Sequence, residues 1–127
     1  MLLNKIKFTS RRVAGLLVLF LAISCFYSSV QAASYTVETV PNAHLSDRSN
    51  RVSNPDGIIL PEDVATINQM LQLVEDSLSI EVAVVAIESI GDNDARMFAT
   101  DLFKHWGIGK KGEDNGLLIL LVTDPAQ

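Results

Sequence analysis

The sequence predicts an α/β fold, a three-layer sandwich around a small mixed sheet that contains a parallel βαβ unit. An amphipathic helical pattern comes first, and two aliphatic runs follow it with a second amphipathic pattern between them. Two strands joined by a helix pair in parallel through a right-handed crossover. The order helix, strand, helix, strand therefore indicates this class.

The first helix is expected at residues 61–78. Pro61 suits the first helical position, where its missing N–H would have no partner. Glu62 and Asp63 suit the positive end of the helix dipole. Apolar residues at alternating three- and four-residue spacing indicate one stripe that packs on a sheet, namely Val64, Ile67, Leu71, Val74 and Leu78.

Two strands are expected at residues 80–87 and 117–123. Both are continuous aliphatic runs, which indicates strands buried on both faces. The second helix, at residues 92–106, connects them, with a cap from Asp92, Asn93 or Asp94. Gly107 follows as the residue type that ends helices in the left-handed conformation.

The first 32 residues have the order of a signal peptide. A basic stretch ends at Arg12, an apolar stretch of 11 residues follows, and small residues lead to a cleavage site after Ala32. A spanning helix needs roughly 20 residues. An uncleaved anchor and a lipoprotein cut before Cys25 are the alternatives that stay open. The protein is therefore expected to be exported to the periplasm or the cell envelope.

The chain is thus divided into three parts. Residues 1–32 are the signal peptide, residues 33–55 an extended N-terminal segment with a short edge strand at 51–53, and residues 56–127 the α/β domain. Two main strands make a thin sheet, and the sequence stops four residues after the second. The domain is therefore expected to be truncated at its C-terminus.

Charge and cysteine usage exclude several classes of function. Without residues 1–32 the chain keeps 6 basic and 15 acidic residues, so its formal charge moves from −5 to −9. Such a domain repels phosphate backbones, and nucleic acid is excluded as a partner. The one cysteine, Cys25, lies in the signal peptide, so the mature domain has neither disulfides nor thiol chemistry. Oligomeric state is not encoded in any pattern found.

The sequence supports neither a nucleotide site nor a zinc site. The glycines of residues 107–112 match G-x-G-x-x-G, but the motif follows a helix and enters a strand, the reverse of a dinucleotide site. No nucleotide cofactor is expected. His44 and His105 have no nearby histidine or cysteine partners in the sequence, so no zinc site is expected either.

Acidic residues are expected to converge at the carboxyl edge of the parallel strands. Asp92 and Asp124 follow the two strands, and Asp56 precedes the first helix, which starts at the same edge. Carboxylate oxygens bind Ca²⁺ or Mg²⁺, so these three residues are the candidate metal ligands. The alternative is that Asp92 and Asp94 cap a helix and Asp56 shapes a turn.

The segment from Trp106 to Gly116 resembles the signature of the TPM domain family. It reads Trp-Gly-Ile-Gly, a charged turn, then Asp-Asn-Gly before an aliphatic strand, and its signature residues are Trp106, Gly107, Gly109, Asp114, Asn115 and Gly116. The resemblance covers the N-terminal part of the domain, because family members continue past Gln127. Asn54 stands where the family pattern has an aspartate.

The resemblance implies a mixed sheet flanked by helices in a bacterial envelope or thylakoid-lumen protein. It also implies links to acid phosphatase activity, divalent cations and photosystem repair. Three hypotheses follow: a protein-interaction or membrane-protein maintenance module with an envelope or membrane protein as partner, a cation-dependent acid phosphatase, and an inactive fragment of a longer protein. An aspartyl nucleophile at Asp124 is disfavoured because Ala126 stands where a second aspartate is expected.

The candidate metal ligands generate a first test. Because Asp124 follows a buried strand at the ligand-binding edge, Asp124→Asn should abolish any upward shift in melting temperature that millimolar Ca²⁺ causes. Thermal unfolding with chelator and then with Ca²⁺ measures this. An unchanged shift in the variant would rule out this site.

Overall fold

The computed structural model describes residues 33–109 and 112–124, so the predicted signal peptide lies outside the described residues. The described residues belong to one compact unit, and none of their helices is both long and apolar enough to cross a membrane. The elements follow in the order α2 (Ala43–Ser46), β1 (Val52–Ser53), α3 (Pro61–Leu78), β2 (Glu81–Ile87), α4 (Ala95–Trp106) and β3 (Gly116–Val122).

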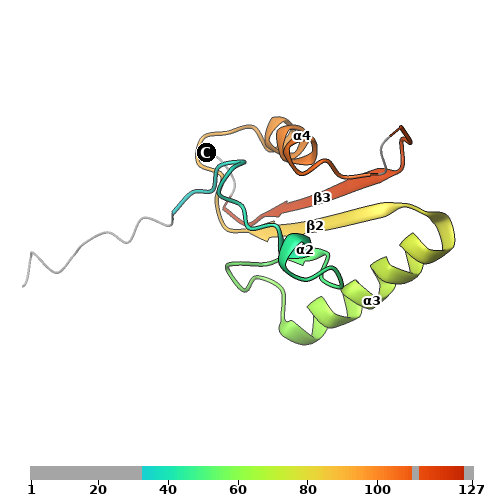
Figure 1. The fold of residues 1–127 in the computed structure, drawn as a ribbon. Coiled ribbons are helices and arrows are strands. Elements are labelled where there is room, and N and C mark those ends of the chain that lie inside the picture. The colour runs from blue at the N-terminus through green and yellow to red at the C-terminus, as the bar shows by residue number, and fades with distance from the viewer. Residues whose placement is uncertain (1–32, 110–111, 125–127) are drawn as a thin grey trace, which may run out of the picture. The chain divides into compact units, whose positions relative to one another are not determined.

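The sheet has the order β1-β2-β3, with all three strands parallel (Figure 1). In the central strand β2, Val84 is paired with Val52 on one side and Ile119 on the other. Helix α3 packs against β1 and β2, whereas α4 packs against β3. The predicted α/β class and the parallel βαβ unit are confirmed. The antiparallel strand of a mixed sheet is not among the described residues.

Helix α3 has the predicted bounds, with Pro61 as its first residue. It ends at Ser79, which adopts a left-handed conformation at φ 57° and donates its N–H to the Glu75 carbonyl. No residue of α3 is fully buried, and Leu78, the last position of the predicted stripe, is 65% exposed. The stripe is shallow at this end because the helix stops there and the chain turns toward β2.

Helix α4 begins at Ala95, three residues later than predicted. Of the three predicted caps, Asp94 is the one used, since its carboxylate accepts a hydrogen bond of 3.0 Å from the Met97 N–H. An N-cap residue keeps a non-helical backbone, so residues 92–94 form the turn before the helix. Phe98 and Leu102 are the buried residues of α4.

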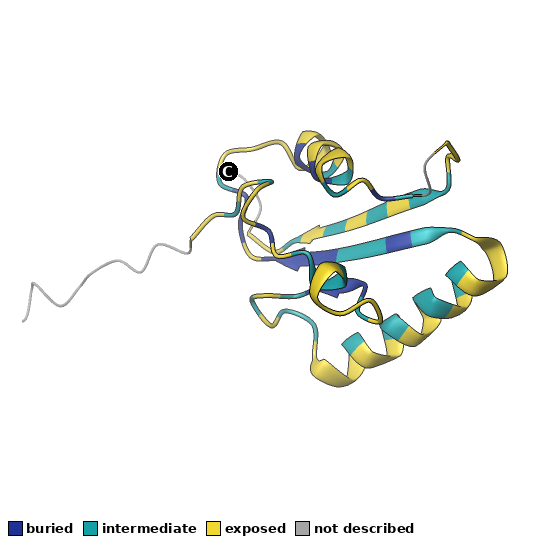
Figure 2. Ribbon diagram, viewed as in Figure 1, coloured by how far each residue is buried: buried dark blue, intermediate teal, exposed yellow. Residues whose placement is uncertain are grey.

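The prediction that the second strand is buried on both faces is wrong for β3. Its residues alternate between partly buried and exposed, with Leu117, Ile119 and Leu121 between 45% and 49% exposed (Figure 2). The other three side chains pack against the core, namely Leu118, Leu120 and Val122. The reason is that α4 covers one face of β3, while α3 lies over β1 and β2. For β2 the prediction holds better, with Val85, Ala86 and Ile87 fully buried.

The sequence predicts an extended segment at residues 33–55, but the structure has a turn and a short helix there. The Thr36 N–H donates to the Thr39 hydroxyl at 2.8 Å, which closes a turn, and Asn42 caps α2. Residues 52–53 do form the predicted edge strand. Val40 is only 4% exposed and joins the core formed by Val85, Ile87, Ile90, Phe98 and Leu102. This segment therefore shares its core with the rest of the domain.

The alternation in β3 can be tested with neighbouring leucines. Leu120→Ala should lower the free energy of unfolding by about 2 kcal/mol, because Leu120 packs on the core. Leu121→Ala should cost well under half as much, since Leu121 is 45% exposed. Urea unfolding measures both. Equal losses would mean that β3 is covered on both faces.

Candidate functional site

The predicted signature segment begins at a helix stop. Gly107 has φ 63°, and its N–H donates to the carbonyls of Phe103 and Lys104 at 3.1 and 3.2 Å. A left-handed backbone is easy for glycine and strained for other residues. The predicted end of the helix at Gly107 is confirmed.

The same segment returns to the start of β2 and is held there by hydrogen bonds. The Gly109 N–H donates to the Glu81 carboxylate at 2.9 Å, and the Glu81 N–H donates to the Asn115 carbonyl at 2.9 Å. The Asn115 side-chain amide donates to the Ser79 carbonyl at 2.7 Å. Asp114 is exposed. These bonds tie the segment after α4 to the residues before and within β2.

Gly116 is the tightest point of this arrangement. A Cβ at this position would lie 2.7 Å from the Ile108 carbonyl oxygen and 2.9 Å from the Gly109 nitrogen. Both are backbone atoms, which cannot swing away as the end of a side chain can. Only glycine therefore lets β3 start beside Ile108, paired with Glu81.

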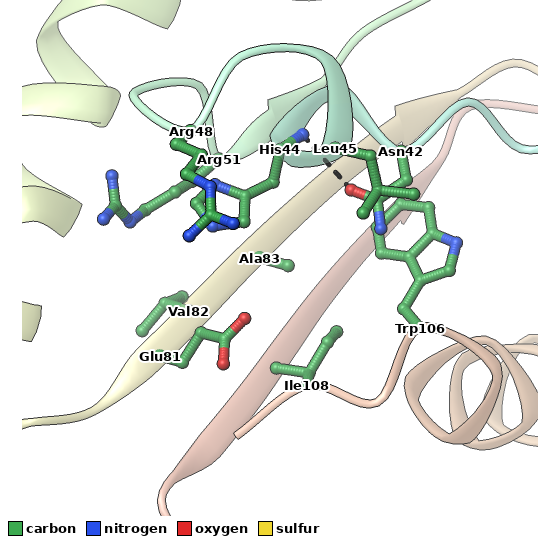
Figure 3. Close-up of a pocket in the computed structure, with 10 residues that line it drawn as sticks. All are labelled: Asn42, His44, Leu45, Arg48, Arg51, Glu81, Val82, Ala83, Trp106 and Ile108. Carbon is green, nitrogen blue, oxygen red and sulfur yellow. Dashed lines mark hydrogen bonds between the residues drawn. The ribbon is translucent and has the colours of Figure 1, made fainter. Parts of the chain in front are cut away.

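A cavity of about 260 Å³ lies between this segment, α2 and the start of β2. Its charged and polar lining includes His44, Arg48, Arg51 and Glu81, and its apolar lining includes Leu45 and Trp106. In Figure 3 the two arginines and His44 lie on one side and Glu81 on the other, with Trp106 at one end. The cavity thus joins two arginines from the N-terminal segment to residues of the signature segment.

Arg51 is the most firmly held residue of this lining. Its N–H donates to the Asn68 side-chain oxygen at 2.8 Å, and its carbonyl accepts from the Val84 N–H at 2.9 Å. Its guanidinium forms an ion pair with Glu75 of α3, with Nε and Nη2 both donating to Oε2. Nearby, the Asp47 carboxylate accepts from the Ser49 hydroxyl and N–H, which lowers the pKa of Asp47 and fixes the loop that carries Arg48.

Sequence reasoning missed this cavity. It expected ligands at the carboxyl edge, whereas the cavity is lined by Glu81, the first residue of β2. Arg48 and Arg51 are two of only six basic residues after position 32, and this was the available signal. The expected division of the chain at residue 55 hides this signal, because it separates both arginines from the α/β domain.

Two of the candidate metal ligands, Asp56 and Asp124, lie beside Glu88 at the carboxyl end of β2, where Asp56 holds the backbone. Its Oδ1 accepts from the Tyr35 hydroxyl at 2.8 Å, and its Oδ2 accepts from the Glu88 N–H at 2.8 Å. The Asp124 N–H donates to the Glu88 carbonyl at 2.7 Å. Asp56 and Asp124 therefore both bind the backbone of the residue that follows β2.

Asp92 is exposed in the turn before α4. Within residues 33–109 and 112–124, no group of three or more histidine, aspartate or glutamate side chains is placed to hold a metal ion. Of the alternative roles, the helix cap is confirmed for Asp94 and not for Asp92. Asp56 lies in the turn that the Gly57 N–H closes on the Asn54 carbonyl, but its carboxylate binds Tyr35 and Glu88. The Ca²⁺ or Mg²⁺ site stays a prediction.

The TPM domain family matches residues 52–127, which begins at β1 and includes the whole signature segment. The chain belongs to the TPM domain family. Within this TPM domain the signature residues Gly107, Gly109 and Gly116 serve a backbone turn and a close approach, while Trp106 lines the cavity and packs on the core.

A solved structure has the same fold. The solution NMR structure of the N-terminal domain of a protein from P. gingivalis superposes with a TM-score of 0.65 at 34% sequence identity. The match covers 72% of this chain and 58% of that one, so this chain spans little more than half the length of the structure it matches. No curated protein gives a significant match.

The Tyr35–Asp56 bond predicts a pH dependence of stability. The hydrogen bond to Asp56, more than burial and the negative charges of Asp56 and Glu88, raises the pKa of Tyr35 above 10.0. A raised folded-state pKa contributes stability below the unfolded value, and this contribution is lost as pH rises through the folded value. Tyr35→Phe should therefore lower the free energy of unfolding by about 1 kcal/mol at pH 7.

This difference between Tyr35→Phe and the native protein should shrink above about pH 10, where the native tyrosine begins to ionise. Urea unfolding at neutral and at alkaline pH measures it. A difference that stays constant over this range would contradict the role given to the Tyr35–Asp56 bond.

Proposed function

We propose that this TPM domain is an exported protein-interaction module of the cell envelope that helps to maintain membrane proteins. One observation carries the proposal: a row of large aliphatic side chains stands exposed on an edge strand. Large apolar patches on a soluble domain commonly mark surfaces that bind another polypeptide.

The exposed row consists of Leu117, Ile119 and Leu121 of β3 and is named the open face. These side chains point away from the face of β3 that packs on the core, because neighbouring residues of a strand point to opposite sides. Among the described strands, α3 contacts β1 and β2, so it leaves the open face uncovered.

The chemistry of the partner follows from charge. Within residues 33–109 and 112–124 there are 15 acidic residues against 4 basic ones. Electrostatic complementarity favours a partner segment that is apolar where it meets the open face and basic on its flanks. Strand β3 lies at the edge of the described sheet, so an extended partner segment can also pair with it through backbone hydrogen bonds.

The acid phosphatase remains the alternative function, and the inactive fragment is the third. The phosphatase needs a cation held by converging carboxylates, and the described residues contain no such group of three. The interaction module requires only the surface described above. For this reason it is the function put forward.

The test places a photo-crosslinking amino acid at Leu121 of the full chain in cells. We expect one discrete cross-linked partner. Ile119→Asp should reduce its yield about tenfold, the equivalent of roughly 1.4 kcal/mol of binding free energy, because a charge replaces an apolar contact. Cell fractionation and the N-terminal sequence of the mature protein, expected at Ala33, check the export.

Leu73→Asp is the matched control. Leu73 is a similarly exposed leucine, at 65%, but it lies beside Ser49 and Asn68, away from the open face. This variant should keep the full yield. A yield that Ile119→Asp leaves unchanged, or a product made only of two copies of this chain, would contradict the interaction module. Cation-dependent hydrolysis of an aryl phosphate would favour the phosphatase.

A further inference from the structure

The cavity beside α2 gathers two of the few arginines of an acidic domain, although Glu81 also lines it and Glu75 pairs with Arg51. Of the four basic residues in 33–109 and 112–124, two line this one cavity, Arg48 and Arg51. His44 lines it as well. In a domain with an excess of carboxylates, solvation alone gives no reason for two arginines to share a cavity.

Two buried nitrogens of this lining have no hydrogen-bond partner among the described residues. They are Nη1 of Arg51 and Nδ1 of His44. Arg51 is only 7% exposed, and Glu75 uses its Nε and Nη2 but leaves Nη1 unpaired. A buried donor without an acceptor costs about 1–3 kcal/mol, and more when it is charged. A guanidinium can only donate, so its partner must be a hydrogen-bond acceptor, such as an oxygen of a bound molecule.

The site is also rigid before any ligand arrives. Asn68 and Val84 hold the Arg51 backbone, and Glu75 holds its side chain. The opposite wall is fixed as well, since the Glu81 carboxylate accepts the Gly109 N–H. A preorganised site loses less free energy on binding than one that must be ordered.

We propose that this cavity binds a small oxyanion, a carboxylate or a phosphate, carried on an apolar body. Arg48, Nη1 of Arg51 and His44 supply the contacts to the anionic oxygens, as arginine does for both groups. Trp106, Leu45 and Ile108 supply apolar surface for the rest of the molecule. The volume of about 260 Å³ is below the range of roughly 300–1,000 Å³ for drug-sized ligands, so the ligand is small.

This site is separate from the open face, because its lining includes none of the three open-face residues. Binding at the cavity is therefore independent of partner binding at the open face, and each can be tested without the other. The proposed small-molecule site lies on the side of the signature segment that carries Trp106 and Ile108.

The experiment is an NMR titration of the protein with four probes: acetate, benzoate, inorganic phosphate and phenyl phosphate. The readouts are the Arg51 Nε–H and the Trp106 indole N–H. Saturable shifts of both are expected, with a Kd of about 1 mM for the better aromatic probe and weaker binding of its non-aromatic counterpart. A preference for benzoate identifies carboxylates as the ligand class, and a preference for phenyl phosphate identifies phosphates.

Arg48→Gln should weaken binding about tenfold, and added salt should weaken it in the native protein. Arg48 is exposed, so its loss should leave the fold intact, unlike a change at Arg51. Arg96→Gln is the matched control, since Arg96 lies on α4 beside Thr100 and Phe103. The absence of saturable shifts, or equal affinity in Arg48→Gln, would overturn the proposal and leave ordered water as the partner of Arg51.

Discussion

The fold depends on the close approach of two backbones at Gly116. With no side chain there, β3 begins in contact with Ile108 and Gly109, and its first residue pairs with Glu81 of β2. From that pairing the parallel register runs unbroken to Ile87 and Val122. A register set at one end orients every side chain of β3, since neighbouring residues point to opposite faces. The identity of one residue therefore decides which leucines reach the core.

The two proposed surfaces both follow from this constraint. The signature segment forms one wall of the cavity, because it carries Trp106 and Ile108 back to α2 and the start of β2. It also turns Leu118 and Leu120 toward the core. The alternate residues Leu117, Ile119 and Leu121 are left on the open face. The signature segment of the TPM domain accordingly shapes both surfaces for which a binding role is proposed, the cavity and the open face.

The sequence predicted local features well and long-range ones poorly. The bounds of α3 were predictable because Pro61 and the apolar spacing mark a helix whatever packs on it. The exposure of alternate residues in β3 could not be predicted, because in a run where every residue is aliphatic the sequence does not distinguish the covered face from the exposed one. The cavity could not be predicted for a related reason. Arg51 is held by Glu75, which is 24 residues away in the chain, and no local sequence pattern indicates such a pair.

The most direct test of how the signature segment is held against β2 is the hydrogen exchange of the Gly109 amide, which donates to the Glu81 carboxylate. Amides held by the folded domain exchange through its opening, whereas those of an undocked loop exchange almost freely. The structure predicts that Gly109 is protected to a degree comparable with Val84, whose N–H donates to Arg51 across the sheet. Exchange of Gly109 at the rate of an unfolded chain, with Val84 still protected, would contradict the account.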